Sequence, residues 1–201
     1  MNAELVNYIE EHILPQYDMF ADGHDRQHIE MVINESLYLA RKYGAEENIA
    51  YTIASYHDLG MAQGRSKHHL TSAIILDKDN NLRQWFSSEQ IRIMKEAIED
   101  HRASAIEVPR TLYGCIIADA DHFIVPEDIL RRTVVYGKTI YPELSFDEQL
   151  ERAYSYVNEK YSEKGYLHFH LGDERSMEGL DALRRLLKDK DRFQLVCTQY
   201  L

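Results

Sequence analysis

The spacing of hydrophobic and polar residues follows a helical period over most of the chain. One core-facing stripe, at the i, i+3, i+4, i+7 positions of a helix, is formed by Ala50, Ile53, Ala54 and His57. Only residues 166–171 alternate as a strand would, and we allow a short extended piece there, which does not change the fold class. Helical segments are predicted at residues 3–14, 27–43, 50–58, 69–76, 87–101 and 145–161. The pattern therefore predicts an all-α protein.

Several of the predicted helix ends carry recognisable signals. Pro15 follows the first helix, and Gly44, a residue type common directly after helices, follows the second. Ser145 and Glu148 have the spacing of a capping box, in which each side chain satisfies a backbone amide of the first helical turn. Leucines at residues 180–187 recur at helical spacing and predict a further helix that docks on the core.

Three polar residues occupy positions that face the predicted core. His57 lies in the stripe described above, Asp58 follows it directly, and His101 shares a second stripe with Met94 and Ile98. A core histidine hydrogen-bonded to a carboxylate would explain any single pair. Burying all three without a common partner would be costly, so their coincidence favours a metal ion.

Composition narrows the class of protein. The chain has 201 residues, of which 44% are hydrophobic and 28% charged, as expected for one globular domain. Its formal net charge of -11 disfavours extended nucleic acid as a partner, because a phosphate backbone would be repelled. A small phosphorylated ligand is compatible with this net charge, since a bound metal and a few cations reverse the charge locally.

The location of the protein is predicted from what the sequence lacks. No stretch approaches the roughly 20 apolar residues needed to span a bilayer, and the first residues show no targeting segment. Cys115 and Cys197 lie far apart without histidine or cysteine at zinc-finger spacing, so we interpret both as buried thiols. We expect a cytoplasmic protein without membrane contact, and the sequence leaves its oligomeric state open.

The candidate chemistry lies where histidines stand beside carboxylates. These places are residues 23–28 (Gly-His-Asp-Arg-Gln-His), 56–60 (Tyr-His-Asp-Leu-Gly) and 119–122 (Asp-Ala-Asp-His). Imidazole and carboxylate suit divalent first-row metals, and the absence of nearby thiolates disfavours a closed structural zinc site. Such a mixed site leaves positions for water and substrate, and a metal lowers the pKa of its bound water. Hydrolysis of a phosphate ester is the chemistry that follows.

His28, the adjacent pair His57-Asp58 and a later aspartate resemble the pattern of the HD-domain superfamily of metal-dependent phosphohydrolases. The resemblance covers about residues 17–133. It implies a helical bundle, and it makes His28, His57, Asp58 and Asp121 the ligands of one metal, because Ala120-Asp121 fits the family's last motif. Helical spacing alone does not separate Asp121 from Asp119. With the length of the chain, we expect one HD-type domain over residues 1–201, with a metal-site core at about residues 17–133 and C-terminal helices 145–201 packed on it.

Some members of the superfamily hold a second metal with two further histidines. His68 or His69, together with His101, occupy the corresponding places, although the first two suit an exposed loop and His101 a substrate contact equally well. Candidate phosphate-binding residues beside the site are Arg65, Lys67 and Arg102, each of which could also be an ordinary solvated cation.

We therefore expect a hydrolase that acts on a small phosphorylated substrate, with a nucleotide as the favoured class, through a metal-bound hydroxide. The cofactor is one divalent ion or two, with manganese, iron, cobalt, nickel, zinc and magnesium unresolved. Asp58 is the candidate for proton transfer. Two alternatives stay open: a di-iron oxygenase of the same superfamily, and a sensor module that binds nucleotide and metal without turnover.

Overall fold

The computed structural model describes residues 1–20, 25–102 and 107–201, and within these ranges the chain is helical without strands. The α-helices are α1 (Ala3–His12), α2 (Arg26–Tyr43), α3 (Glu47–Tyr56), α4 (His68–Lys78), α5 (Ser88–Asp100), α6 (Leu112–Asp121), α7 (Pro126–Ile140), α8 (Phe146–Tyr161), α9 (Glu174–Leu187) and α10 (Lys190–Cys197). Short 3₁₀ helices span Leu14–Met19, Leu59–Gln63, Arg65–Lys67, Asn80–Gln84 and Thr198–Tyr200. The predicted all-α class is confirmed.

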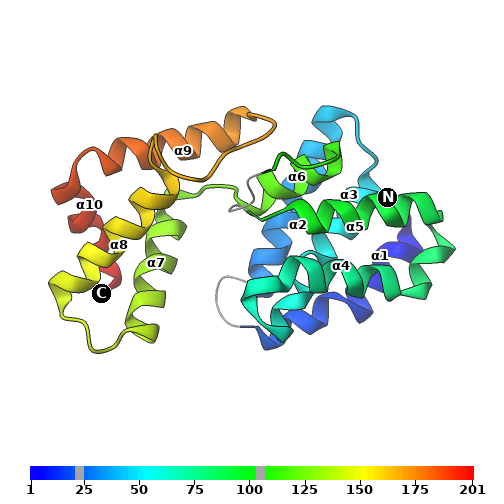
Figure 1. Ribbon diagram of the computed structural model, residues 1–201, viewed down its shortest axis with the longest axis horizontal. Coiled ribbons are helices and arrows are strands. Elements are labelled where there is room, and N and C mark those ends of the chain that lie inside the picture. Colours follow the sequence, from blue (N-terminus) through cyan, green and yellow to red (C-terminus); the bar gives the residue numbers. More distant parts are fainter. Residues whose placement is uncertain (21–24, 103–106) are drawn as a thin grey trace. The chain divides into compact units, whose positions relative to one another are not determined.

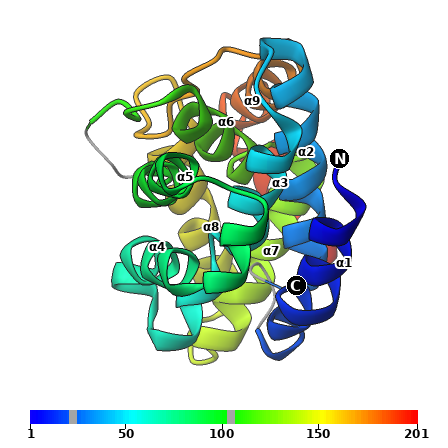
Figure 2. The ribbon, with the colours of Figure 1, turned by 90° about the vertical axis from the view of Figure 1, so that its right-hand side faces the viewer.

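The described residues form two compact units, Met1–His122 and Phe123–Leu201. In the first unit α2 packs against α3 and α6, and α4 lies beside α5, as Figures 1 and 2 show. Its core contains Ile29, Val32, Ile53, Met94 and Ile98, all with at most 1% of their surface exposed. Helical periodicity predicts most of these residues to be buried, because the apolar face of each amphipathic helix packs against the core.

In the second unit α8 packs against α7, α9 and α10. Leu150, Val157, Leu183 and Phe193 are buried there, and the ring of Tyr154 meets Phe193 edge-on at a centroid distance of 5.3 Å. The helix of residues 180–187 is thus part of a packed unit. A single domain over residues 1–201, with these helices on the metal-site core, stays a prediction.

The helix signals in the sequence are borne out in part. Both halves of the capping box at Ser145 are present, and the chain leaves α2 at Gly44 in a left-handed conformation, with φ of 71°. The first helix, predicted to reach residue 14, ends at His12, because Pro15 lies at the start of the 3₁₀ helix Leu14–Met19. Residues 166–171 form an irregular connection in which no extended strand is found. Among the described residues, no helix is both long and apolar enough to cross a membrane.

Candidate metal centre

The adjacent pair His57-Asp58 lies where α3 gives way to a 3₁₀ helix. His57 is the C-cap residue of α3, and its Nδ1 lies 2.7 Å from the carbonyl oxygen of Ala54, which accepts a hydrogen bond from the ring. A proton on Nδ1 leaves the lone pair of a neutral imidazole on Nε2, facing away from the backbone. The local turn therefore orients His57 as a ligand and points Asp58 into the same space.

The other two predicted ligands also stand at helix ends. His28 is in the first turn of α2, where the Asp25 side chain caps the helix by accepting a hydrogen bond from the His28 amide at 3.0 Å. Asp121 is the last residue of α6, and the next residue, His122, donates from Nδ1 to the carbonyl oxygen of Ala118 at 2.6 Å. Helix ends from three separate elements thus converge on one point.

His28, His57, Asp58 and Asp121 form one group whose ligand atoms all lie within 4.8 Å of one another. The Nε2 atom of His28 is 3.1 Å from Oδ1 of Asp121 and 3.8 Å from Oδ2 of Asp58. The Nε2 atom of His57 is 3.5 Å from each of the same two oxygens. This buried nitrogen has no hydrogen-bond partner among the described residues.

These separations suit a bound divalent ion. An ion held about 2.1 Å from nitrogen and oxygen ligands separates neighbouring ligand atoms by about 3.0 Å in octahedral geometry and about 3.4 Å in tetrahedral geometry. Most of the contacts in this group are too long for ordinary hydrogen bonds, which lie at about 2.7 to 3.2 Å. The donor set and its spacing therefore fit a metal, and a metal would satisfy the otherwise unpartnered nitrogen of His57.

Asp58, His68 and His101 form a second group. The Nδ1 atom of His68 lies 2.8 Å from the carbonyl oxygen of Arg65, and the Nδ1 atom of His101 lies 2.7 Å from the carbonyl oxygen of Ile98. Their Nε2 atoms lie only 3.0 Å apart. If both Nδ1 atoms carry the protons, the two Nε2 lone pairs repel each other unless the histidines share an added proton or would both ligate a metal ion.

Asp58 is shared by the two groups, one oxygen to each. Its Oδ2 faces His28 and His57, whereas its Oδ1 lies 3.4 Å from Nε2 of His68 and 3.9 Å from Nε2 of His101. A carboxylate placed in this way is able to bridge two ions. Two ions that share a ligand, about 3.5 to 4 Å apart, are the arrangement that clamps both oxygens of a phosphoryl transfer.

The protonation states of the groups follow from their surroundings. Burial alone would lower the pKa of His57, but Asp58 and Asp121 outweigh it and raise that pKa to about 9. Burial and the neighbouring His57 lower the pKa of His101 to about 3. Burial would raise the pKa of Asp121, yet His122, His28 and His57 hold it well below its usual range. Near neutral pH His101 is therefore neutral and Asp121 ionised, the forms in which each ligates a metal, whereas His57 without a metal is protonated and would lose that proton on metal binding.

The remaining candidate residues lie at or beside these groups. Asp119 is 1% exposed but belongs to neither group, so of the two alternatives the structure brings Asp121 to the histidines. His69 is half-buried outside the second group, with its ring 6.5 Å from that of His101. The candidate cations are all exposed, and Arg102 donates to the Ser66 carbonyl oxygen at 3.1 Å.

Two residues at the site had no role assigned from the sequence. The Nε2 atom of His122 lies 3.4 Å from Oδ2 of Asp121, a contact that its position next to a candidate ligand could have suggested. Tyr17 is fully buried against the end of α3 and is separated from Asp58 by about forty residues of sequence. No periodic signal in one sequence points to a contact over that distance.

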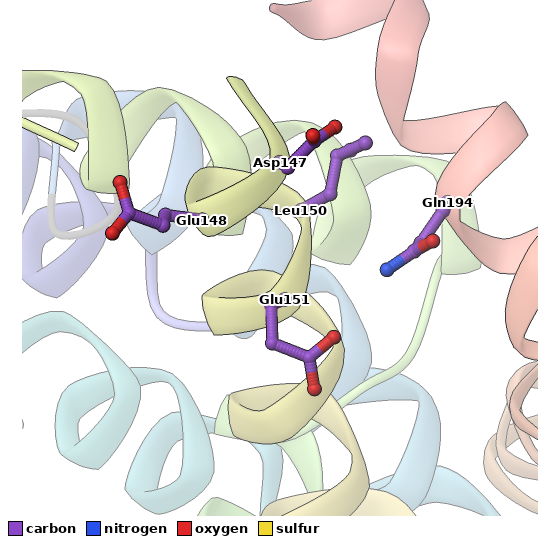
Figure 3. Close-up of a pocket in the computed structure, with 5 residues that line it drawn as sticks. All are labelled: Asp147, Glu148, Leu150, Glu151 and Gln194. Atoms are coloured by element: carbon purple, nitrogen blue, oxygen red, sulfur yellow. The ribbon is translucent and has the colours of Figure 1, made fainter. Parts of the chain in front are cut away.

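A hollow on the second unit contains none of the predicted site residues. It is lined by Asp147, Glu148, Leu150, Glu151 and Gln194 (Figure 3). The lining contains three carboxylates and no basic residue; Glu151 pairs with Lys190 at 2.6 Å, and the other two carboxylates would repel a phosphate group. The hollow is therefore unsuitable for the predicted substrate class.

Gly60 lies in the turn after Asp58 and packs closely against α4. Its amide donates to Oγ of Ser72 at 2.8 Å, and an added Cβ would lie 2.3 Å from the carbonyl oxygen of His68. We expect Gly60→Ala to reduce the free energy of unfolding by roughly 1 to 3 kcal/mol through overpacking, and to weaken metal binding because His68 must move. Urea unfolding and Co²⁺ titration measure the two effects.

Gly44→Ala is the matched control for this substitution. Gly44 has a φ of 71°, and a Cβ there meets nothing within 4 Å. The left-handed backbone costs an alanine about 1 to 2 kcal/mol, so stability falls by a similar amount without any displacement at the site. Equal Co²⁺ affinity in the two variants would contradict a role of the Gly60 contact in placing His68.

Comparison with known proteins assigns the fold to a family. Residues 26–125 match the family model described as HD domain, and the chain belongs to the HD-domain superfamily. This range contains both groups of metal-ligand candidates. A crystal structure of a predicted HD superfamily hydrolase from an uncultured Thermotogales bacterium is 23% identical over 78% of this chain and 86% of that chain, with a TM-score of 0.52. At this identity the likeness concerns the fold. The search of curated proteins found no match.

Proposed function

We propose that this protein is a metal-dependent phosphohydrolase that acts on a small phosphorylated substrate, with nucleotides as the class to test first. The observation that carries the proposal is the convergence of His28, His57, Asp58 and Asp121 at metal-ligand spacing inside an HD domain. His68 and His101 would hold a second ion together with Asp58. The spacing itself does not distinguish among the divalent metals.

The residues of the chain would contribute orientation and charge. When bound, a divalent ion supplies an activated water as nucleophile and neutralises charge on the phosphoryl oxygens. Backbone carbonyl oxygens fix the ring orientation of His57, His68 and His101, so the ligands are preorganised. Asp58, which contacts both groups, is the proposed site of proton transfer.

Unpaired cations beside the second group support a phosphorylated substrate. Five of the eleven Lys and Arg residues of the first unit form ion pairs with acidic residues, namely Arg26, Arg41, Arg92, Lys95 and Arg110. In contrast, Arg65, Lys67 and Arg102 make no ion pair with any residue that the structure describes. Arg65 supplies the carbonyl oxygen that contacts His68, and Arg102 follows His101. Their charges are thus available to phosphate oxygens.

Elemental analysis of the purified protein, followed by a hydrolysis screen, tests the proposal. Metal-free protein is reloaded with Mn²⁺, Fe²⁺, Co²⁺, Ni²⁺, Zn²⁺ or Mg²⁺ and assayed on nucleotides, phosphomonoesters and phosphodiesters. We expect metal-dependent release of phosphate or of a hydrolysed product. Metal without hydrolysis, but with oxygen consumption by the iron-loaded protein, would favour the di-iron oxygenase. A bound nucleotide that survives incubation with metal would favour the sensor module.

A further inference from the structure

Tyr17 meets the end of α3 at the point where the ligand pair leaves the helix. The residue lies in the 3₁₀ helix Leu14–Met19, has no exposed surface, and donates a hydrogen bond from its hydroxyl to the carbonyl oxygen of Ser55 at 3.0 Å. Ser55 is two residues before His57 and three before Asp58. A phenol from a distant segment is thus fixed to the backbone that carries two candidate ligands.

The contact satisfies a backbone group that the helix itself leaves unpaired. The last four carbonyl groups of an α-helix have no partner within the helix. In α3, which ends at Tyr56, the Ala54 oxygen is taken up by the His57 ring and the Ser55 oxygen by Tyr17. The helix end is therefore closed by two side chains, of which one is a ligand and the other is Tyr17.

The hydroxyl of Tyr17 also faces the following turn. Burial and the charge of Asp58 raise the pKa of Tyr17 well above its usual value, while backbone hydrogen bonds from Asp58 and Leu59 lower it. The same hydroxyl therefore donates to the last turn of α3 and lies near the backbone of the turn beyond it. Tyr17 is thus fixed to one side of the break in the helix and lies beside the other.

We propose that Tyr17 is a positioning residue that fixes the turn between α3 and the 3₁₀ helix Leu59–Gln63, so that His57 and Asp58 face the metal together. This inference rests on the proposed metal site. Groups that orient ligands without touching the metal typically contribute about 10- to 100-fold to metal affinity.

The test is Tyr17→Phe, which removes only the hydroxyl, with Tyr56→Phe as matched control. Tyr56 is equally buried and stands at the end of the same helix, but its hydroxyl donates to Asp79 at 2.6 Å, outside both ligand groups. Amide hydrogen exchange is measured on the metal-free proteins, and Co²⁺ affinity is measured by chelator competition. We expect faster exchange at Asp58 and Leu59 and about 10- to 100-fold weaker Co²⁺ binding in Tyr17→Phe alone.

Each outcome decides between specific positioning and general destabilisation. Equal loss of Co²⁺ affinity in both variants, or unchanged exchange and affinity in Tyr17→Phe, would overturn the role of Tyr17. A parent protein that binds no Co²⁺ would refute the proposed metal site instead. In that event, unchanged exchange at Asp58 and Leu59 would overturn the positioning role as well, whereas faster exchange in Tyr17→Phe alone would support it.

Discussion

Asp58→Asn is expected to release metal from both ligand groups at once. The carboxylate of Asp58 contributes Oδ2 to the group with His28 and His57, and Oδ1 to the group with His68 and His101. An amide of the same shape lacks the negative charge and offers a single oxygen. We expect hydrolysis to fall on the order of 10³-fold, which corresponds to about 4 kcal/mol of transition-state stabilisation. Elemental analysis and the hydrolysis assay measure the two losses.

His101→Gln is the control that shows the effect of losing one ion, against which the loss of both ions in Asp58→Asn is compared. His101 belongs to the second group only. If the protein holds two ions, this variant should retain one and keep the ion held by His28, His57 and Asp121. An Asp58→Asn protein that retains its full metal content would contradict the bridging arrangement. Circular dichroism of both variants verifies that the helical fold persists.

The helices that position the site could be predicted because their core faces are periodic. Residues 87–101, predicted from such a face, correspond to α5, Ser88–Asp100. The Ser145 capping box was also predictable, because both of its contacts lie within four residues of sequence. Pro15 misled the prediction because proline is equally suited to start a helix and to follow one. Helix periodicity and capping signals thus predict structure correctly where the contacts that cause it lie close together in the sequence.

The candidate ligands could be proposed from the sequence, but their division into two groups could not. His68 and His69 are adjacent and chemically identical, and only the packing of α4 against α5 decides which ring meets His101. The same holds for Tyr17, whose contact with Ser55 joins segments 38 residues apart. One sequence contains no periodic signal for contacts of this kind. They depend on how whole helices pack.

Burial alone would have selected Asp119 rather than Asp121 in the last motif. Asp119 is 1% exposed, whereas the side chain of Asp121 is 16% exposed. The more buried carboxylate belongs to neither ligand group, and the less buried one is 3.1 Å from His28. A site that admits substrate must leave part of its ligands accessible, so complete burial is a poor criterion for a catalytic carboxylate.

Asp121→Asn should therefore lose metal but keep its stability, whereas Asp119→Asn should lose stability but keep its metal. Asp121 contacts His28 and His57, so its loss should remove the ion of the first group and lower hydrolysis by at least about 10²-fold, with little change in the unfolding transition of the metal-free protein. Asp119 lies in neither group but is buried, so its amide variant should lose roughly 1 to 3 kcal/mol of stability and retain its metal. Metal analysis and urea unfolding of both variants measure this contrast. Metal loss in Asp119→Asn at unchanged stability would assign the last ligand to Asp119.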